Sequence, residues 1–243
     1  MPTLPPARNE VIANFGIPVI VAPNGTIATN GVVTVGTALP TTYSGGAWVR
    51  FPAGAVVAGS AGLYYTVFSS TTVGQVYTNF SDASTAFTPS IPTSLVAATG
   101  SNAGYTQGVG SDFNLANITV AGGLMGANGM LRPSYYIQTN NSAGNKISKC
   151  AFSTIAMCTI TTTTSIGTRI QPYLLNAGSM ALQKSPLATS GTAGIGLTSG
   201  TASAMTYSTI DTSTAQQLVL TGQIATATDY IILESLTIEV LKA

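Results

Sequence analysis

The chain has 243 residues, of which 45% are hydrophobic and only 6% are charged, and it contains no histidine. Ordinary soluble domains carry about 25% charged residues. A net charge of +1 gives no electrostatic field that would hold nucleic acid, and no apolar run approaches the roughly 18–20 residues that span a membrane as a helix. We therefore expect much of the surface to contact other protein or to be covered by hydroxyl and amide groups, as in a structural protein of an assembly.

The first 15 residues contain three prolines and few bulky side chains. They predict an extended arm with one helical turn over residues 8–14. Such an arm could attach the protein to a neighbour or to a larger particle, and a mobile tail is the alternative.

Short β-type segments separated by turn residues follow the arm. We expect strands over the ranges 17–21, 32–35, 47–51, 62–68 and 72–77, which are rich in Val, Tyr, Phe and Trp. The Asn-Gly pairs that begin at Asn24 and Asn30 are strong turn signals, because both residue types tolerate positive φ. Residues 82–110 show no clear period and are expected to be loop with one short strand. The segments together predict an N-terminal β domain over residues 16–110.

A second set of β-type segments occupies the rest of the chain. The expected strands cover the ranges 113–120, 130–139, 147–160, 169–175, 206–210, 217–224 and 230–241. Nowhere do apolar residues keep a helical spacing beyond two turns, so the predicted fold class is all-β. Many short strands at a spacing of about 8–12 residues suggest a β-sandwich or jelly roll. We therefore expect an arm over residues 1–15, a short-stranded β domain over 16–110 and a C-terminal sandwich, jelly-roll-like, over 111–243.

The final strand places a carboxylate within an apolar stripe. Strict alternation from Tyr230 onward puts Glu234 on the same face as Ile232 and Leu236. Because an unpaired buried carboxylate is costly, we interpret Glu234 as half of a buried or inter-subunit ion pair with Arg132 or Arg169, or as exposed at an edge. The functional alternative is a catalytic acid.

The charged residues fall into blocks of opposite sign. All charged residues from Arg132 to Lys184 are basic. The acids Asp211, Asp229, Glu234 and Glu239 follow this segment. One interpretation is two unrelated solvated sets. The other is that the basic middle and the acidic end meet across the fold or across a subunit boundary.

The sequence offers no recognisable catalytic, cofactor or metal site. Without histidine the usual base of serine catalysis and the usual zinc ligand are missing. Cys150 and Cys158 form no metal signature, and in a cytoplasm they are expected to be reduced thiols. On one continuous strand they would lie far beyond disulfide reach, so only a hairpin between them would permit a bond. We predict a protein that is not an enzyme and needs no cofactor.

Several aromatic residues are candidates for a binding surface. Trp48, Tyr64 and Tyr65 could stack on sugars, since an aromatic face suits a sugar ring. Core packing or a subunit interface is the other interpretation of these residues, and aromatic residues make up only 7% of the chain.

Two regions resemble virion proteins of tailed bacteriophages. The first consists of TALPTTY from Thr37, FPAGAVVAGSAGLYY from Phe51 and SSTTVGQVY from Ser69; the second consists of AGGLMGANGMLR from Ala121, NNSAGNK from Asn140 and LESLTIEVL from Leu233. The resemblance implies a capsid decoration, head fibre or tail fibre, commonly a homotrimer, that binds other virion proteins. It further implies that the protein is made and assembled in the host cytoplasm and resides in the virion.

Two other functions stay open as alternatives. A receptor-binding tail fibre would use exposed aromatic residues and the amide-rich loop from Asn140 to Asn145 to bind a host surface glycan. A polysaccharide depolymerase would depend on Glu234 and a second acid that the sequence does not identify.

Overall fold

The computed structural model describes residues 9–28, 31–52, 62–81, 103–105, 107–186, 188–190 and 205–242. These residues form 19 strands and no helix, which confirms the all-β prediction. Most of the loop expected over residues 82–110 lies outside the described ranges, as do Asp82 and residues 1–8.

The strands of the first half of the chain are β1 (Asn9–Phe15), β2 (Val19–Val21), β3 (Gly25–Ile27), β4 (Val32–Val35), β5 (Ala47–Phe51), β6 (Gly62–Phe68), β7 (Val73–Ser81), β8 (Ala103–Tyr105) and β9 (Phe113–Val120). Those of the second half are β10 (Met130–Thr139), β11 (Lys146–Phe152), β12 (Ile155–Thr162), β13 (Gly167–Ile170), β14 (Leu174–Asn176), β15 (Gln183–Pro186), β16 (Ala188–Ser190), β17 (Met205–Ser208), β18 (Gln216–Ile224) and β19 (Ile231–Leu241).

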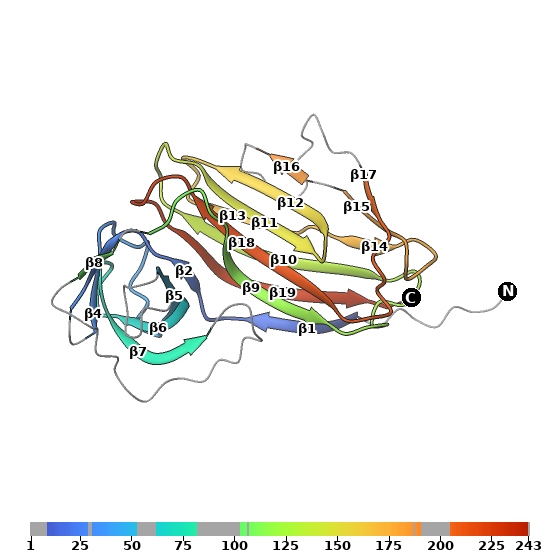
Figure 1. The fold of residues 1–243 in the computed structure, drawn as a ribbon, viewed down its shortest axis with the longest axis horizontal. Helices are drawn as coiled ribbons and strands as arrows, with labels where there is room; N and C mark the ends of the chain where they lie inside the picture. The colour runs from blue at the N-terminus through green and yellow to red at the C-terminus, as the bar shows by residue number, and fades with distance from the viewer. Residues whose placement is uncertain are drawn as a thin grey trace.

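The strands form two sheets. A 14-stranded sheet runs in the order β17-β15-β14-β10-β19-β2-β5-β6-β7-β4-β3-β8, with β1 paired to β19 and β13 paired to β10. A 5-stranded sheet runs in the order β16-β12-β11-β18-β9. The pairings are antiparallel except for β2 with β5 and β12 with β16. In Figure 1 the smaller sheet lies over the part of the large sheet that contains β10 and β19, and β4–β7 curl together at the other end of the molecule.

The buried side chains form two cores. The larger core lies between the 5-stranded sheet and the β10–β19 region, and it includes Leu115, Phe152 and Leu220. The smaller core gathers side chains from β2 to β7 and includes Ile20 and Phe51. One continuous sheet passes through both regions, so the division at residue 110 stays a prediction.

β19 borders both cores through its two faces, since Ile231 belongs to the larger core and Ile232 to the smaller one. Its alternation also shifts in the middle of the strand. Leu233 and Leu236 both belong to the larger core, although an unbroken strand places residues three apart on opposite faces. Against β10, Leu233 and Ser235 pair with consecutive residues, which leaves Glu234 as the extra residue of a β-bulge. The expected unbroken alternation over residues 230–241 was therefore wrong at this point.

The bulge gives Glu234 a different partner from those expected. The Tyr43 hydroxyl donates a hydrogen bond of 2.6 Å to Oε1 of Glu234. Burial and this hydrogen bond raise the pKa of Tyr43 well above its usual value, because ionising the phenol would place two negative charges together. Within the chain, Glu234 thus bonds to a neutral donor rather than to Arg132 or Arg169; an ion pair between subunits stays a prediction.

The described part of the N-terminal arm is a strand, not a helical turn. β1 pairs with the second half of β19, from Asn9 opposite Leu241 to Phe15 opposite Leu236. β2 pairs with the first half of the same edge. Between β1 and β2 the pairing along this edge of β19 is interrupted. The three residues that lie there, Gly16, Ile17 and Pro18, are opposite the bulge of β19.

A second segment also differs from its prediction. Residues 147–160, expected as one strand, are the hairpin of β11 and β12. The chain reverses at Ser153 with a φ of 51°. Positive φ is unusual for serine, which explains why turn rules based on Gly and Asn missed this reversal.

The raised pKa of Tyr43 predicts alkaline destabilisation. Above about pH 10 an unfolded tyrosine loses its proton whereas folded Tyr43 keeps it, so the free energy of unfolding falls as pH rises, by about 1.4 kcal/mol per pH unit for this residue. Urea unfolding of Tyr43→Phe should show a shallower fall above pH 10. Tyr207→Phe, at a position that is 69% exposed, is the matched control. An equal pH dependence in wild type and Tyr43→Phe would contradict the assignment.

Candidate functional site

Two turns meet at the end of the larger core and form the best-defined polar cluster of the described chain. The first turn, residues 140–145, joins β10 to β11, and the second, residues 225–230, joins β18 to β19. The amide of Ala225 donates to the carbonyl of Asn145 at 2.9 Å, and the amide of Tyr230 donates to Oδ1 of Asn140 at 3.1 Å. We call these two segments, with Lys146, the paired turns.

A buried lysine anchors the first turn. Lys146 is 1% exposed, and its Nζ donates to the Ser142 carbonyl at 3.2 Å, to Ser142 Oγ at 2.7 Å and to the Thr163 carbonyl at 2.6 Å. An ammonium has three donors, so all of them are engaged.

A buried carboxylate holds the second turn to the first. Asp229 is also 1% exposed, and its Oδ1 accepts hydrogen bonds from Asn140 at 2.9 Å and from Ser142 Oγ at 2.6 Å. Ser142 therefore bridges the lysine and the aspartate. Burial lowers the pKa of Lys146, and the negative charge of Asp229 offsets part of that effect.

Glycine permits the close approach of the turns. A Cβ added to Gly144 would lie 2.3 Å from Oδ2 of Asp229 and 2.8 Å from Oγ1 of Thr226. Both distances are shorter than any ordinary contact, so a side chain at this position would push the carboxylate away from its partners.

Lys146, Ser142 and Asp229 include the residue types of a serine nucleophile with a lysine base, but their hydrogen bonds do not suit that chemistry. A lysine that accepts a proton from serine must be neutral and must offer a lone pair, whereas Lys146 donates to three acceptors. A cavity beside Lys146 and Ser148 measures only about 10 Å³, roughly the space for one water molecule. The contacts favour a structural role for the cluster, which fixes the shape of the two turns.

The outer side of the paired turns is uncharged and polar. Asn141, Asn145 and Thr226 are exposed. Two further segments are attached to the same place. The amide of Asn24, between β2 and β3, donates to the Ala227 carbonyl at 2.7 Å, and Thr37 Oγ1, after β4, donates to the Thr228 carbonyl at 2.8 Å. The cluster therefore presents amides and hydroxyls from a well-connected base.

The two arginines singled out from the sequence lie apart from this cluster. Arg132 pairs with Glu239 at 2.7 Å, directly across β10 and β19. Arg169 is exposed on β13 and lies opposite Tyr136. The Arg132–Glu239 pair and the approach of Lys146 to Asp229 confirm that the basic middle and acidic end of the chain meet within the fold.

The three aromatic candidates are core residues. Trp48, Tyr64 and Tyr65 are all at most 5% exposed, and the rings of Trp48 and Tyr65 meet edge-on at 5.7 Å. The Tyr65 hydroxyl donates to the Gly45 carbonyl at 2.7 Å. Their proposed use as a sugar-stacking surface was wrong, because no ring face is open to a sugar.

Sequence reasoning missed Lys146 and Asp229. A signal was present in KISKCAF, because Lys146 alternates in phase with Ser148, Cys150 and Phe152, and all four side chains are buried. Charged residues at the start of a strand are normally solvated, which hides this signal.

The described residues hold neither a metal-binding group of side chains nor a membrane-spanning helix. They contain no group of three or more His, Cys, Asp or Glu side chains placed to hold a metal ion. Within the same ranges no helix is long and apolar enough to cross a membrane.

The buried network predicts a large cost for removing the lysine charge. Lys146→Met leaves Asp229 without a nearby cation and two carbonyls without a donor, so we expect a loss of about 3–5 kcal/mol in the free energy of unfolding. Lys149 lies on the same strand as Lys146 and forms an exposed ion pair with Asp112. Lys149→Met, which breaks this pair, should lower the free energy of unfolding by less than about 1 kcal/mol.

Denaturant unfolding of both variants, of Asp229→Asn and of Lys146→Met/Asp229→Asn measures these effects. The double variant should lose less than the sum of the losses of Lys146→Met and Asp229→Asn, since the charges act together. Equal losses for Lys146→Met and Lys149→Met would contradict the buried network.

Comparison with known proteins identifies no relative of this chain. No family model matches the sequence, and neither a curated protein nor a solved structure matches it.

Proposed function

We propose that this chain is a non-enzymatic structural component of a tailed-phage virion, a β-rich homotrimer that decorates the head or forms a fibre on the head or tail. The proposal combines the resemblance of the regions that begin at Thr37 and Ala121 with one structural observation. That observation is a surface on which most charges are already neutralised within the chain.

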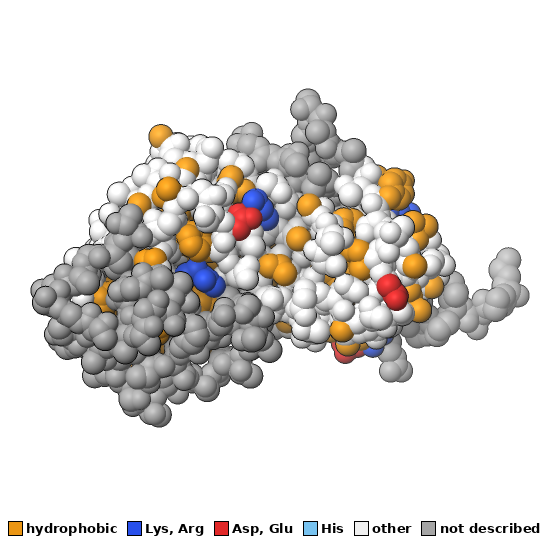
Figure 2. Space-filling view, viewed as in Figure 1, with side chains coloured by type: hydrophobic (Ala, Val, Ile, Leu, Met, Phe, Trp, Pro, Cys, Tyr) orange, Lys and Arg blue, Asp and Glu red, His pale blue; other side chains and the backbone are white. Residues whose placement is uncertain are grey.

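Ion pairs and burial account for most charged side chains of the described chain. The pairs are Arg132 with Glu239, Lys149 with Asp112 and Lys242 with Glu10. Lys146 and Asp229 are buried. Figure 2 accordingly shows few blue or red side chains among the white and orange ones on the face that it draws. Such a surface repels copies of itself only weakly.

Exposed apolar side chains supply the attraction that assembly needs. The large ones are Val11, Val109, Tyr136, Ile166, Leu182, Met205 and Tyr207, each at least 39% exposed. Tyr and Met are enriched at protein interfaces, whereas Lys, Glu and Asp are depleted there. The composition of this surface therefore supports contact with other subunits.

In the proposed particle, the larger core is that of a β-sandwich of jelly-roll type, and residues 1–15 attach the subunit. The pairing of Asn9 with Leu241 supports this arrangement, because it brings the arm to the end of β19. The bonds of β1 to β19 would hold the arm to the body of the subunit.

The proposal predicts an oligomer that tolerates salt. Light scattering of the purified chain should give the mass of a trimer, and the trimer should persist at about 1 M salt, where ion pairs at the surface are screened within about 3 Å. Mass spectrometry of purified virions should find the chain. A monomer that is also absent from virions would overturn the proposal, and dissociation by salt alone would contradict the low-charge interface.

The paired turns support a second candidate function, a receptor-binding fibre that recognises a host surface glycan. Asn141 and Asn145 are exposed on the first turn, whose shape is fixed by bonds of Ser142 to Lys146 and Asp229. A turn that is already ordered avoids part of the entropy cost of binding. The uncharged surface of this turn suits a neutral glycan.

Replacing both amides tests this second function. Asn141→Ala/Asn145→Ala should weaken binding of the purified chain to host cells by about tenfold, since each lost hydrogen bond is worth about 0.5–1.5 kcal/mol. Gln217→Ala, an exposed amide at the opposite end of β18, is the matched control. Unchanged binding by the double variant would exclude the paired turns as the receptor site.

A further inference from the structure

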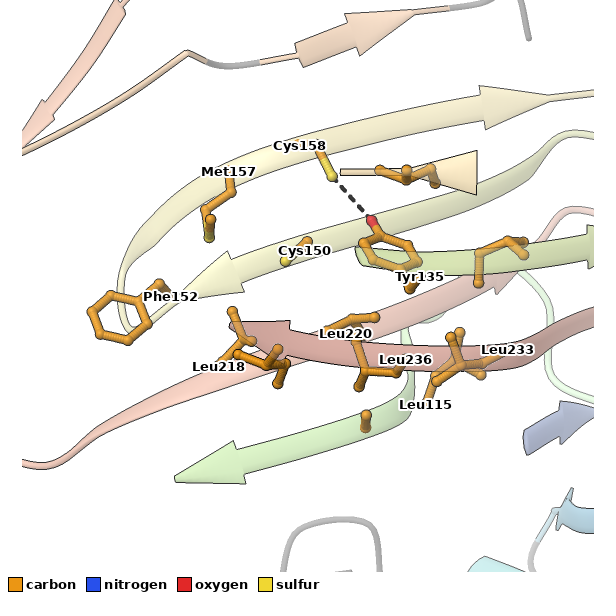
Figure 3. Close-up of a cluster of buried hydrophobic side chains, with 14 of the residues drawn as sticks. Leu115, Tyr135, Cys150, Phe152, Met157, Cys158, Leu218, Leu220, Leu233 and Leu236 are labelled. Carbon is orange, nitrogen blue, oxygen red and sulfur yellow. Dashed lines mark hydrogen bonds between the residues drawn. The ribbon is translucent and has the colours of Figure 1, made fainter. Parts of the chain in front are cut away.

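The two cysteines of the chain lie side by side in the larger core. Cys150 on β11 and Cys158 on β12 are direct partners in the antiparallel register of the hairpin. Both are free thiols and both are fully buried. Figure 3 shows them on neighbouring strands within the cluster that also contains Tyr135.

The register meets the backbone requirement for a disulfide. Directly opposed residues of an antiparallel pair have Cα atoms about 4.5–5.5 Å apart, and disulfides join Cα atoms about 4.4–6.8 Å apart. The pleat directs both side chains to the same face of the sheet. The expected Cα separation of the pair therefore lies within the range that a disulfide spans.

In the reduced chain, the thiol of Cys158 contacts a buried tyrosine hydroxyl. The Tyr135 hydroxyl and Cys158 Sγ are 3.1 Å apart, and in Figure 3 the sulfur of Cys158 points toward this hydroxyl whereas that of Cys150 points elsewhere. Bond formation would therefore replace the contact between Cys158 and the Tyr135 hydroxyl. The hydrogen bond with Cys158 and burial raise the pKa of Cys150, which keeps it as a thiol in the folded chain.

We propose that Cys150 and Cys158 are a cross-strand disulfide site, reduced in a cytoplasm-like milieu and bonded in an oxidising one. With a small-molecule disulfide as oxidant, one cysteine thiolate attacks a sulfur of that disulfide and releases one small thiol, giving a mixed disulfide. The second thiolate then attacks the protein sulfur and releases the other small thiol. The two cysteines lose two protons and two electrons, and the small disulfide gains both. This inference is independent of the proposed virion role.

Burial sets when the reaction can occur. A mixed disulfide with a small molecule does not fit in a core where both sulfurs are inaccessible. The exchange therefore takes place before the β11–β12 hairpin has packed or while it is locally open. Oxidation should accompany folding and should be slow in the folded chain.

Refolding in a glutathione buffer tests the site. The full chain is refolded from denaturant with oxidised glutathione or with excess reductant, then denatured, treated with a thiol-alkylating reagent and weighed by mass spectrometry. We expect oxidised wild-type protein to be lighter by two hydrogen atoms and to take no label, and the reduced protein to take two labels. The oxidised protein should also have the higher Tm.

A register control separates a built site from chance oxidation. Cys158→Ala/Thr159→Cys moves the thiol by one residue to the opposite face of β12, so this variant should keep two labelled thiols after the same treatment. Circular dichroism confirms that each protein has folded. Two labelled thiols in folded, oxidised wild type, a bond between chains, or equal oxidation of the shifted variant would overturn the proposal.

Discussion

The fold depends on a single strand that borders both cores. β19 pairs with β10 along one edge and with β1 and β2 along the other, so it joins the ends of the chain to its middle. The bulge at Glu234 keeps Leu236, Ile238 and Val240 on the side of the larger core, together with Leu233 from the first half of the strand. A bulge leaves one residue out of the ladder, and here that residue is a half-buried carboxylate that accepts a hydrogen bond from a tyrosine.

Local patterns predicted most of the regular strands and failed where long-range pairing decides. The β-branched and aromatic segments at Ala47–Phe51 and Met130–Thr139 became strands close to their expected bounds. The bulge at Glu234 was hidden, because period-2 alternation contains no signal for one inserted residue. The reversal at Ser153 was hidden as well, since the residue takes a backbone conformation that sequence rules assign to Gly or Asn.

The candidate site was less predictable than the fold. The loop from Asn140 to Asn145 was recognised as amide-rich, but its base is formed by a carboxylate that lies 84 or more positions farther along the chain. A charged residue is expected in water unless a partner is known, and the partner of Lys146 becomes visible only when the two turns are brought together. Trp48 shows the reverse error, since an aromatic side chain gives no sign in the sequence of whether its face is open.

The antiparallel pairing of β1 with β19 has a mechanical consequence. Ladder hydrogen bonds of antiparallel strands run perpendicular to the strands, and β1 is bonded from Asn9 to Phe15. Tension applied through the residues before Asn9, along the axis of β1 and away from the body, would shear these bonds together instead of peeling them one at a time. Such a junction resists pulling better than a zipper-like one, so a subunit tethered by its first residues would bear load along this strand.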